Sequence, residues 1–163
     1  MTSTAVRADF FDASALVKVF AEEPLSDVVR TYFHGRPTKY TTPFCFYEAM
    51  NALKGKWKYK GQLSADEYHE AAFQMTAWYG ASSRHVEDLD FTDPQTFVRA
   101  KRISLNSGLD LSDAFQIVSV KFGYFSPLTD ESKTVLVSAD AALAAAARLE
   151  GLRVWNVLTE PQP

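Results

Sequence analysis

Four carboxylate side chains in this sequence stand where short apolar runs end or expected helices begin. They are Asp12, Glu48, Asp113 and Asp140. A single carboxylate among apolar neighbours is costly to bury, and several that converge repel one another. A bound divalent cation reverses both effects, and oxygen ligands alone suit Mg²⁺ or Mn²⁺ better than Zn²⁺. The four acids therefore predict a candidate site for Mg²⁺ or Mn²⁺.

Each acid, taken singly, also has a simpler structural interpretation. Asp12 is placed to cap the helix that follows it, which is a common role for Asp. Asp113 and Asp140 suit the first turn of a helix, with Asp110 as the cap before Asp113. Glu48 sits among apolar and aromatic neighbours, yet a solvent-facing side chain is compatible with its position. Only the joint placement of the acids favours a shared site.

The elements that must position these acids follow from the apolar pattern. Short strand-like runs alternate with longer helical periods, which predicts a mostly parallel sheet with helices on both faces. The expected strands cover residues 8–11, 39–42, 86–91, 134–137 and 153–157. The expected helices cover about 15–20, 24–34, 43–60, 64–82, 93–108, 112–122 and 139–150. Ligands bind beyond the carboxyl ends of parallel strands, so acids at strand ends share one edge.

Composition limits the class of protein. The chain of 163 residues is 47% hydrophobic and 23% charged, which is typical of one globular domain, here residues 1–163. Its 17 basic and 20 acidic side chains give a formal net charge of −3, so bulk charge does not favour polyanion binding. The single cysteine excludes an internal disulfide, and no apolar run is long enough to span a membrane. Because residues 1–7 also lack a signal-peptide pattern, we expect a cytoplasmic protein.

Other catalytic chemistries have little support in the sequence. The three histidines, His34, His69 and His85, are scattered and match no zinc-ligand spacing. Ser14 and Ser138 lie near acids, but nothing places a histidine beside either one, so a serine-hydrolase triad is unsupported. Phosphate-binding glycine loops are absent from a chain with only seven glycines. A phosphatase of the haloacid-dehalogenase type would need an acid where Ser14 stands.

A run of lysines and aromatic residues at the end of the 43–60 helix is a candidate RNA-binding segment. Lysines contact phosphates and aromatic rings stack on exposed bases. The candidate residues are Lys54, Lys56, Trp57, Lys58 and Lys60. The same run is equally compatible with a cationic helix C-terminus that the helix dipole favours, with Trp57 on the apolar face.

The sequence resembles a known family. FFDASALVK over residues 10–18 is similar to the opening motif of PIN-domain nucleases, especially the VapC-type toxins of bacterial toxin–antitoxin pairs. Further similarities follow in the family's order: YTT at 40–42 leading to Glu48 and NAL at 51–53, LSDA at 111–114, LVSAD at 136–140 and GLRV at 151–154. The resemblance extends from about residue 8 to about residue 157.

The resemblance implies a fold and an activity. The fold would be a three-layer α/β/α sandwich with a central, mostly parallel sheet. The activity would be Mg²⁺- or Mn²⁺-dependent endoribonuclease cleavage, in which carboxylate-held metal activates the attacking water. The resemblance makes Asp12, Glu48, Asp113 and Asp140 the catalytic, metal-site acids. We expect Asp12 to be the best direct ligand, followed by Asp113, while Ser14 and Ser138 support the acids and Asp110 remains a possible contributor.

The resemblance also implies partners. Toxins of this type act on RNA and bind a small antitoxin whose tail occupies the acidic cleft. They also pair with a second copy, and the apolar helices expected at 24–34 and 43–60 are candidate surfaces for a homodimer. The alternative is a non-catalytic PIN-like module that binds RNA or protein. Retention of all four acids favours the nuclease over this alternative.

Overall fold

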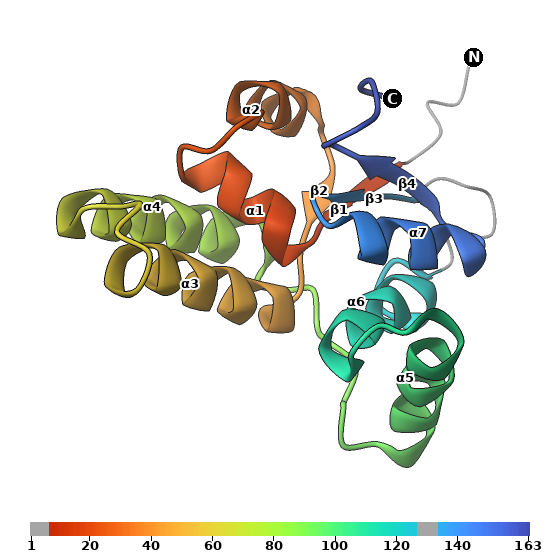
Figure 1. Cartoon of the computed structure of the whole chain (residues 1–163). Coiled ribbons are helices and arrows are strands. Elements are labelled where there is room, and N and C mark those ends of the chain that lie inside the picture. The colour runs from red at the N-terminus through yellow and green to blue at the C-terminus, as the bar shows by residue number, and fades with distance from the viewer. Residues whose placement is uncertain (1–6, 127–133) are drawn as a thin grey trace.

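A four-stranded parallel sheet forms the centre of the protein in the computed structural model, which describes residues 7–126 and 134–163 (Figure 1). The strands are β1 (Ala8–Phe11), β2 (Lys39–Tyr40), β3 (Thr134–Ser138) and β4 (Arg153–Asn156), and their order is β2-β1-β3-β4. Phe11 lies opposite Val137 in the parallel pairing of β1 with β3. The two central strands therefore end at the same edge of the sheet, directly before Asp12 and Ala139.

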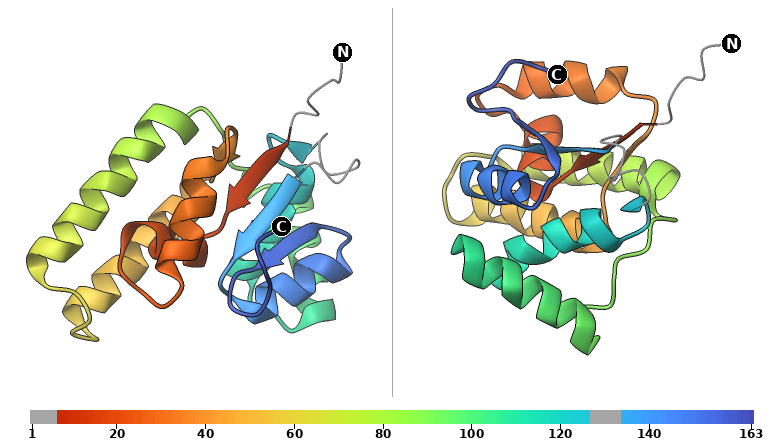
Figure 2. Two further views of the ribbon diagram at one scale, coloured as in Figure 1. Left: turned by 90° about the horizontal axis from the view of Figure 1, so that it is seen from above. Right: turned by 90° about the vertical axis from the view of Figure 1, so that its right-hand side faces the viewer.

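Helices cover both faces of this sheet (Figures 1 and 2). One layer holds α1 (Ala13–Phe20), α2 (Ser26–Gly35), α3 (Pro43–Lys58), α4 (Ala65–Trp78) and the short π-helix η1 (Tyr79–Ser83). The other layer holds α5 (Pro94–Ser107), α6 (Leu111–Phe122) and α7 (Ala141–Leu149). This arrangement confirms the expected α/β fold with three layers.

Alternate residues of the strands supply the two hydrophobic cores. Phe11 and Val137 face the first layer, whereas Phe10 and Leu136 face the second. Successive side chains of a strand point to opposite faces, so a strand covered on both sides is apolar throughout. No helix in the described part of the chain is long and apolar enough to cross a membrane.

The strand expected at residues 86–91 is not present, and that prediction was wrong. The segment has an irregular backbone, and Asp88 accepts a hydrogen bond of 2.5 Å from the backbone N–H of Phe44. Just after β2, Ser83 binds the backbone of Thr41: its Oγ accepts from the Thr41 N–H at 3.0 Å and donates to the Thr41 carbonyl at 2.7 Å. Ser83 therefore occupies the backbone groups of Thr41 that a neighbouring strand would use, and Asp88 instead stabilises the start of α3.

Most helix boundaries agree with the sequence, and the differences have local causes. The helix expected from Pro24 begins at Ser26, because Leu25 adopts a left-handed backbone conformation with φ of 70°. The helix expected from residue 139 begins two residues later, since Asp140 is its cap. The capping box between Ser64 and Glu67 is formed as predicted.

Candidate metal centre

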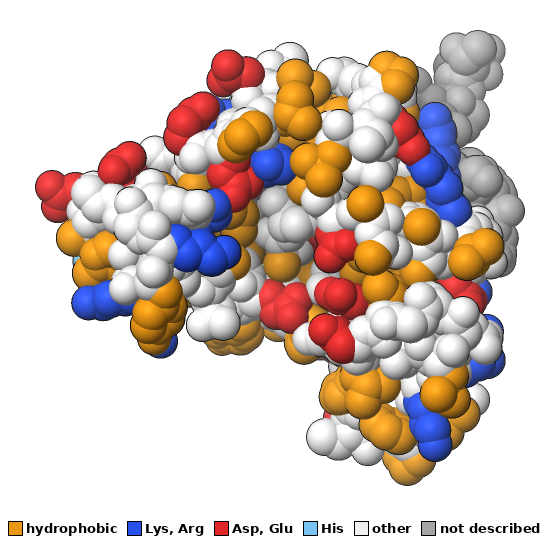
Figure 3. Space-filling model, in the orientation of Figure 1, with side chains coloured by type: hydrophobic (Ala, Val, Ile, Leu, Met, Phe, Trp, Pro, Cys, Tyr) orange, Lys and Arg blue, Asp and Glu red, His pale blue; other side chains and the backbone are white. Residues whose placement is uncertain are grey.

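The four predicted acids lie together at the carboxyl edge of the sheet. Asp12 follows β1, Asp140 follows β3, Asp113 lies in the first turn of α6 and Glu48 lies early in α3. Figure 3 shows acidic side chains gathered on the face where α3, α6 and α7 meet. Burial and, to a smaller extent, repulsion from Asp110, Asp140, Glu48 and Asp12 together raise the pKa of Asp113 from 3.8 to about 6. The acids are therefore close enough to repel one another.

Asp12 is a buried helix cap. Its Oδ1 accepts hydrogen bonds from the backbone N–H of Ala15 at 2.8 Å and from the hydroxyl of Ser14 at 2.7 Å. Burial raises the pKa of Asp12 from 3.8 to about 6, although hydrogen bonds from Ser138, Ser14 and Ala15 oppose the rise. Asp140 adds to the rise by repulsion. The carboxyl group is thus fixed in place while its negative charge stays poorly compensated.

Ser14 and Ser138 join the ends of the two central strands. Their hydroxyl oxygens lie 3.5 Å apart, and Ser14 Oγ accepts from the N–H of Ala139 at 2.9 Å. Ser138 Oγ accepts from the N–H of Asp140 at 3.0 Å. Both serines therefore lie beside the acids, in the position predicted for small supporting hydroxyls.

Asp140 caps α7, so the alternative structural interpretation, a place in the first turn of the helix, is off by one position. Its Oδ1 accepts from the N–H groups of Ala142 at 2.9 Å and Leu143 at 3.0 Å. Asp110 caps α6 in the same way and accepts from the N–H of Asp113 at 2.9 Å. Capping thus fixes the acid Asp140 and brings the extra negative charge of Asp110 next to the cluster.

Glu48 does not point freely into solvent, because two polar side chains of α6 hold its half-buried carboxylate. Ser112 donates to Oε1 at 2.9 Å, and Gln116 donates to Oε2 at 2.8 Å. Burial raises the pKa of Glu48, the hydrogen bond from Ser112 lowers it and repulsion from Asp110 raises it. The sequence pattern alone does not single out Ser112 or Gln116. Their closeness to Asp113 on the same helix is the only feature of the sequence that points to them. It does not reveal that α3 packs beside them.

The charge balance of the site fits a divalent cation. No Lys, Arg or His of the described residues forms an ion pair with any of the four acids. The buried Asp9, by contrast, is neutralised by ion pairs: Arg36 lies 2.7 Å and Arg7 lies 3.0 Å from its carboxylate. Within the described ranges, no three His, Cys, Asp or Glu side chains are already spaced to hold a metal ion. The all-oxygen donor set nevertheless suits Mg²⁺ or Mn²⁺.

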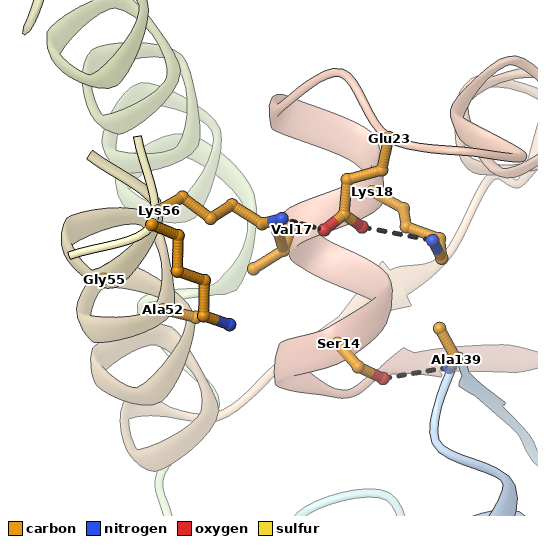
Figure 4. Close-up of a pocket in the computed structure, with 9 residues that line it drawn as sticks. Ser14, Val17, Lys18, Glu23, Ala52, Gly55, Lys56 and Ala139 are labelled. Atoms are coloured by element: carbon orange, nitrogen blue, oxygen red, sulfur yellow. Dashed lines mark hydrogen bonds and ion pairs between the residues drawn. The ribbon is translucent and has the colours of Figure 1, made fainter. Parts of the chain in front are cut away.

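A cleft leads from the acids toward Lys56 of α3 and Lys60 just after this helix. A cavity of about 380 Å³ is lined by Ser14 and Ala139 at one end and by Lys56 farther along (Figure 4), and Lys60 also lines it. A neighbouring hollow of about 310 Å³ is lined by Ser14, Ala52 and Glu48. The two cavities share Ser14 and Ala52, so they form one groove between α1 and α3.

The lysines of the candidate RNA-binding run have different surroundings. Lys56 forms an ion pair with Glu23, which Lys18 also contacts at 3.1 Å (Figure 4). Lys58 lies with Nζ 3.8 Å from the ring centroid of Trp57. Among the predicted lysines, only Lys56 and Lys60 line the groove in the described structure.

The ring of Trp57 packs against other residues of the protein and is not free to stack on a base. It stacks on Tyr68 of α4, with ring centroids 4.7 Å apart and an interplanar angle of 21°. It also packs against the core of the first helical layer. The interpretation of Trp57 as a residue of the apolar helix face therefore agrees with its surroundings.

Comparisons with known proteins bear on the fold. No family model and no curated protein matches this sequence. A solved structure, the crystal structure of PAE2754 from Pyrobaculum aerophilum, is similar to this chain, with a TM-score of 0.57 and 20% sequence identity over 96% of this chain and 95% of that chain. At this identity the similarity supports the fold alone. The protein belongs to the class of three-layer α/β/α proteins with an acidic cluster at the carboxyl edge of the sheet.

Proposed function

We propose that this protein is a metal-dependent endoribonuclease of the PIN-domain type that hydrolyses RNA phosphodiester bonds. One observation carries the proposal: the four acids come from separate segments yet meet at one edge of the sheet, without a cationic side chain of the described residues paired to them. Such an arrangement destabilises the metal-free protein and is therefore typical of a functional site. The family resemblance of the sequence supports the same activity.

The residues of the site have distinct roles in this proposal. When bound, Mg²⁺ or Mn²⁺ would activate a water and stabilise the negative charge that grows on the phosphate oxygens. Asp12 would be a direct ligand, because its buried carboxylate is held rigidly by Ser14 and Ala15. Asp113 would be the second ligand. Glu48 and Asp140 would orient the attacking water or bind through water.

The groove between α1 and α3 would hold the RNA backbone. Lys60 lines it, and Lys56 lines it while paired with Glu23. Phosphate contacts from lysines supply most of the sequence-independent affinity for nucleic acids. We therefore assign Lys56 and Lys60 to phosphates that lie beyond the cleaved bond, and we assign no base stacking to Trp57.

The family resemblance leads us to propose the toxin half of a toxin–antitoxin pair. A small antitoxin would then occupy the acidic groove, and a second copy of this chain would form a homodimer. Exposed apolar side chains on α2 and α3 support a protein contact there: Leu25 at the start of α2, Val28, Tyr47 and, just after α3, Tyr59. Size-exclusion chromatography of the isolated chain should give a dimer at micromolar concentration, and a monomer would contradict this assignment.

Cleavage of a panel of structured RNAs tests the central proposal. Reactions would contain Mg²⁺, Mn²⁺ or EDTA, with wild type, Asp12→Asn and the control Asp27→Asn, an exposed acid on α2. We expect metal-dependent cleavage that Asp27→Asn retains and Asp12→Asn loses by at least 100-fold, because the variant removes a ligand charge while keeping its shape. Equal activity of Asp12→Asn and wild type would contradict the proposal. Mn²⁺ binding without cleavage would support the non-catalytic alternative.

A further inference from the structure

Gln116 joins two of the acids through a single amide group. It lies on α6, one turn after Asp113, and only 3% of its surface is exposed. Its Nε2 donates to Glu48 Oε2 at 2.8 Å and, more weakly, to Asp113 Oδ1 at 3.4 Å. Glu48 belongs to α3, so this amide links carboxylates from two different helices.

The other end of the amide is held by Cys45. The Sγ atom of this buried cysteine donates to Gln116 Oε1 at 3.6 Å. Cys45 and Glu48 lie three residues apart on α3, so they share one face of that helix. Both ends of the Gln116 amide therefore contact α3. Reversing the amide would place its carbonyl oxygen against the carboxylates, which is unfavourable.

The neutral charge of Gln116 matters for the site. A lysine or arginine at this position would neutralise the carboxylates, whereas a glutamate would add to their repulsion. A carboxylate has about four lone-pair sites, so the bonds from Ser112 and Gln116 leave Glu48 able to accept further contacts. Gln116 can thus hold Glu48 and Asp113 together without using the negative charge that a cation needs.

We propose that Gln116 is a positioning residue of the metal site, which holds Glu48 and Asp113 in the arrangement that receives a divalent cation. This inference rests on the proposed function, because it assumes that the four acids bind Mg²⁺ or Mn²⁺. Partners of metal ligands commonly change metal affinity by 10- to 100-fold when they are mutated. Gln116 is such a partner, because it donates hydrogen bonds to two of the proposed metal-site acids, Glu48 and Asp113.

Mn²⁺ titration of the metal-free protein by calorimetry tests the inference without depending on activity. Gln116→Met keeps the volume of the side chain but removes its donor, and we expect Mn²⁺ to bind about 10- to 100-fold more weakly. Ser119→Ala is the matched control, since Ser119 is buried on the same helix and donates only to the carbonyl of Phe115. Its Mn²⁺ affinity should equal that of wild type. If Gln116→Met fails to fold by circular dichroism, Gln116→Asn replaces it, because the shorter amide cannot span to Glu48.

A double variant separates positioning from a general structural role. If Gln116 acts partly through Glu48, adding Gln116→Met to Glu48→Gln should weaken Mn²⁺ binding less than it does in wild type. If Gln116→Met weakens Mn²⁺ binding by the same factor in wild type and in Glu48→Gln, the inference is overturned. Wild-type affinity in Gln116→Met, with binding lost in Asp12→Asn, would overturn the inference and leave the proposed function intact. Equal Mn²⁺ binding by wild type and Asp12→Asn would overturn both.

Discussion

Asp12 and Asp140 each act as a helix cap and as a candidate metal ligand. In both residues the capping hydrogen bonds from backbone N–H groups end on Oδ1. A carboxylate has about four lone-pair sites, so capping leaves sites available for a cation. The structural and functional interpretations of these acids are therefore compatible, and capping supplies the rigidity that a ligand needs.

The variant Asp12→Asn should be more stable than wild type in the absence of metal. The rise of the Asp12 pKa from 3.8 to about 6 corresponds to about 3 kcal/mol of lost stability at pH 7.5, where the buried carboxyl is ionised. Asparagine carries no charge and keeps an oxygen for the cap. Thermal unfolding in EDTA should show a higher melting temperature for the variant at pH 7.5 and a smaller difference at pH 4.5. A lower melting temperature of the variant at both pH values would contradict this prediction.

Metal binding should weaken sharply below about pH 6. The pKa values of Asp12 and Asp113 are both raised to about 6, so protons compete with a cation for these ligands. Displacement of one to two protons predicts about a 10- to 100-fold loss of Mn²⁺ affinity per pH unit in this range. The stability of the metal-free protein should change in the opposite direction and rise from pH 7 to pH 5. Calorimetry at pH 7.5, 6.0 and 5.0 measures the affinity, and a flat profile would refute the assignment of these acids.

At the scale of elements, α3 connects the acidic end of the groove with its basic end. Glu48 lies early in this helix of 16 residues and Lys56 lies near its end. Eight residues of α-helix span about 12 Å, so the two side chains are separated along the groove rather than paired with each other. Packing of α3 on α1 leaves the groove between them.

Replacement of Lys60 should weaken RNA binding, whereas replacement of Lys54 should not. Lys60, just after α3, lines the groove, whereas Lys54 is an exposed residue of α3 that does not. Removing one phosphate contact should lower the slope of log affinity against log salt by about 0.7 for single-stranded RNA. Fluorescence anisotropy in the Asp12→Asn background measures binding without cleavage. Equal effects of Lys60→Ala and Lys54→Ala would indicate non-specific attraction and not a groove.

At the scale of the whole molecule, the candidate site joins segments that are far apart in the sequence. Asp12 follows β1, Glu48 lies on α3, Asp113 begins α6 and Asp140 follows β3. A cation bound to these acids would link the central sheet with both helical layers. Metal binding should therefore stabilise the native fold as a unit.

Mn²⁺ should raise the melting temperature of the wild-type protein. At a free concentration 100 times the dissociation constant, ligand binding adds about 2.7 kcal/mol of stability. For a domain of this size, that corresponds to a rise of about 5 to 10 °C. Thermal unfolding with Mn²⁺, and again after addition of EDTA, measures the effect and its reversal. The same rise in Asp12→Asn would show that Mn²⁺ binds elsewhere.

The sequence alone determined the features that depend on local interactions. The apolar runs of β1 and β3 define buried strands, and the Ser64–Glu67 capping box defines the start of α4. The position of Asp12 directly after a strand places it at the carboxyl edge of a parallel sheet. These features follow from periodicity and capping, because each involves residues that are close in the chain.

Only the tertiary structure decided which side chains meet across elements. Gln116 and Glu48 are 68 positions apart, so no local pattern links them. The different surroundings of Lys56, Lys58 and Lys60 depend on how α3 packs against α1 and α4. Residues 86–91 have a strand-like pattern, but Ser83 already occupies the backbone N–H and carbonyl of Thr41, just after β2. In each case the deciding energy comes from contacts between distant segments, which the order of residue types does not specify.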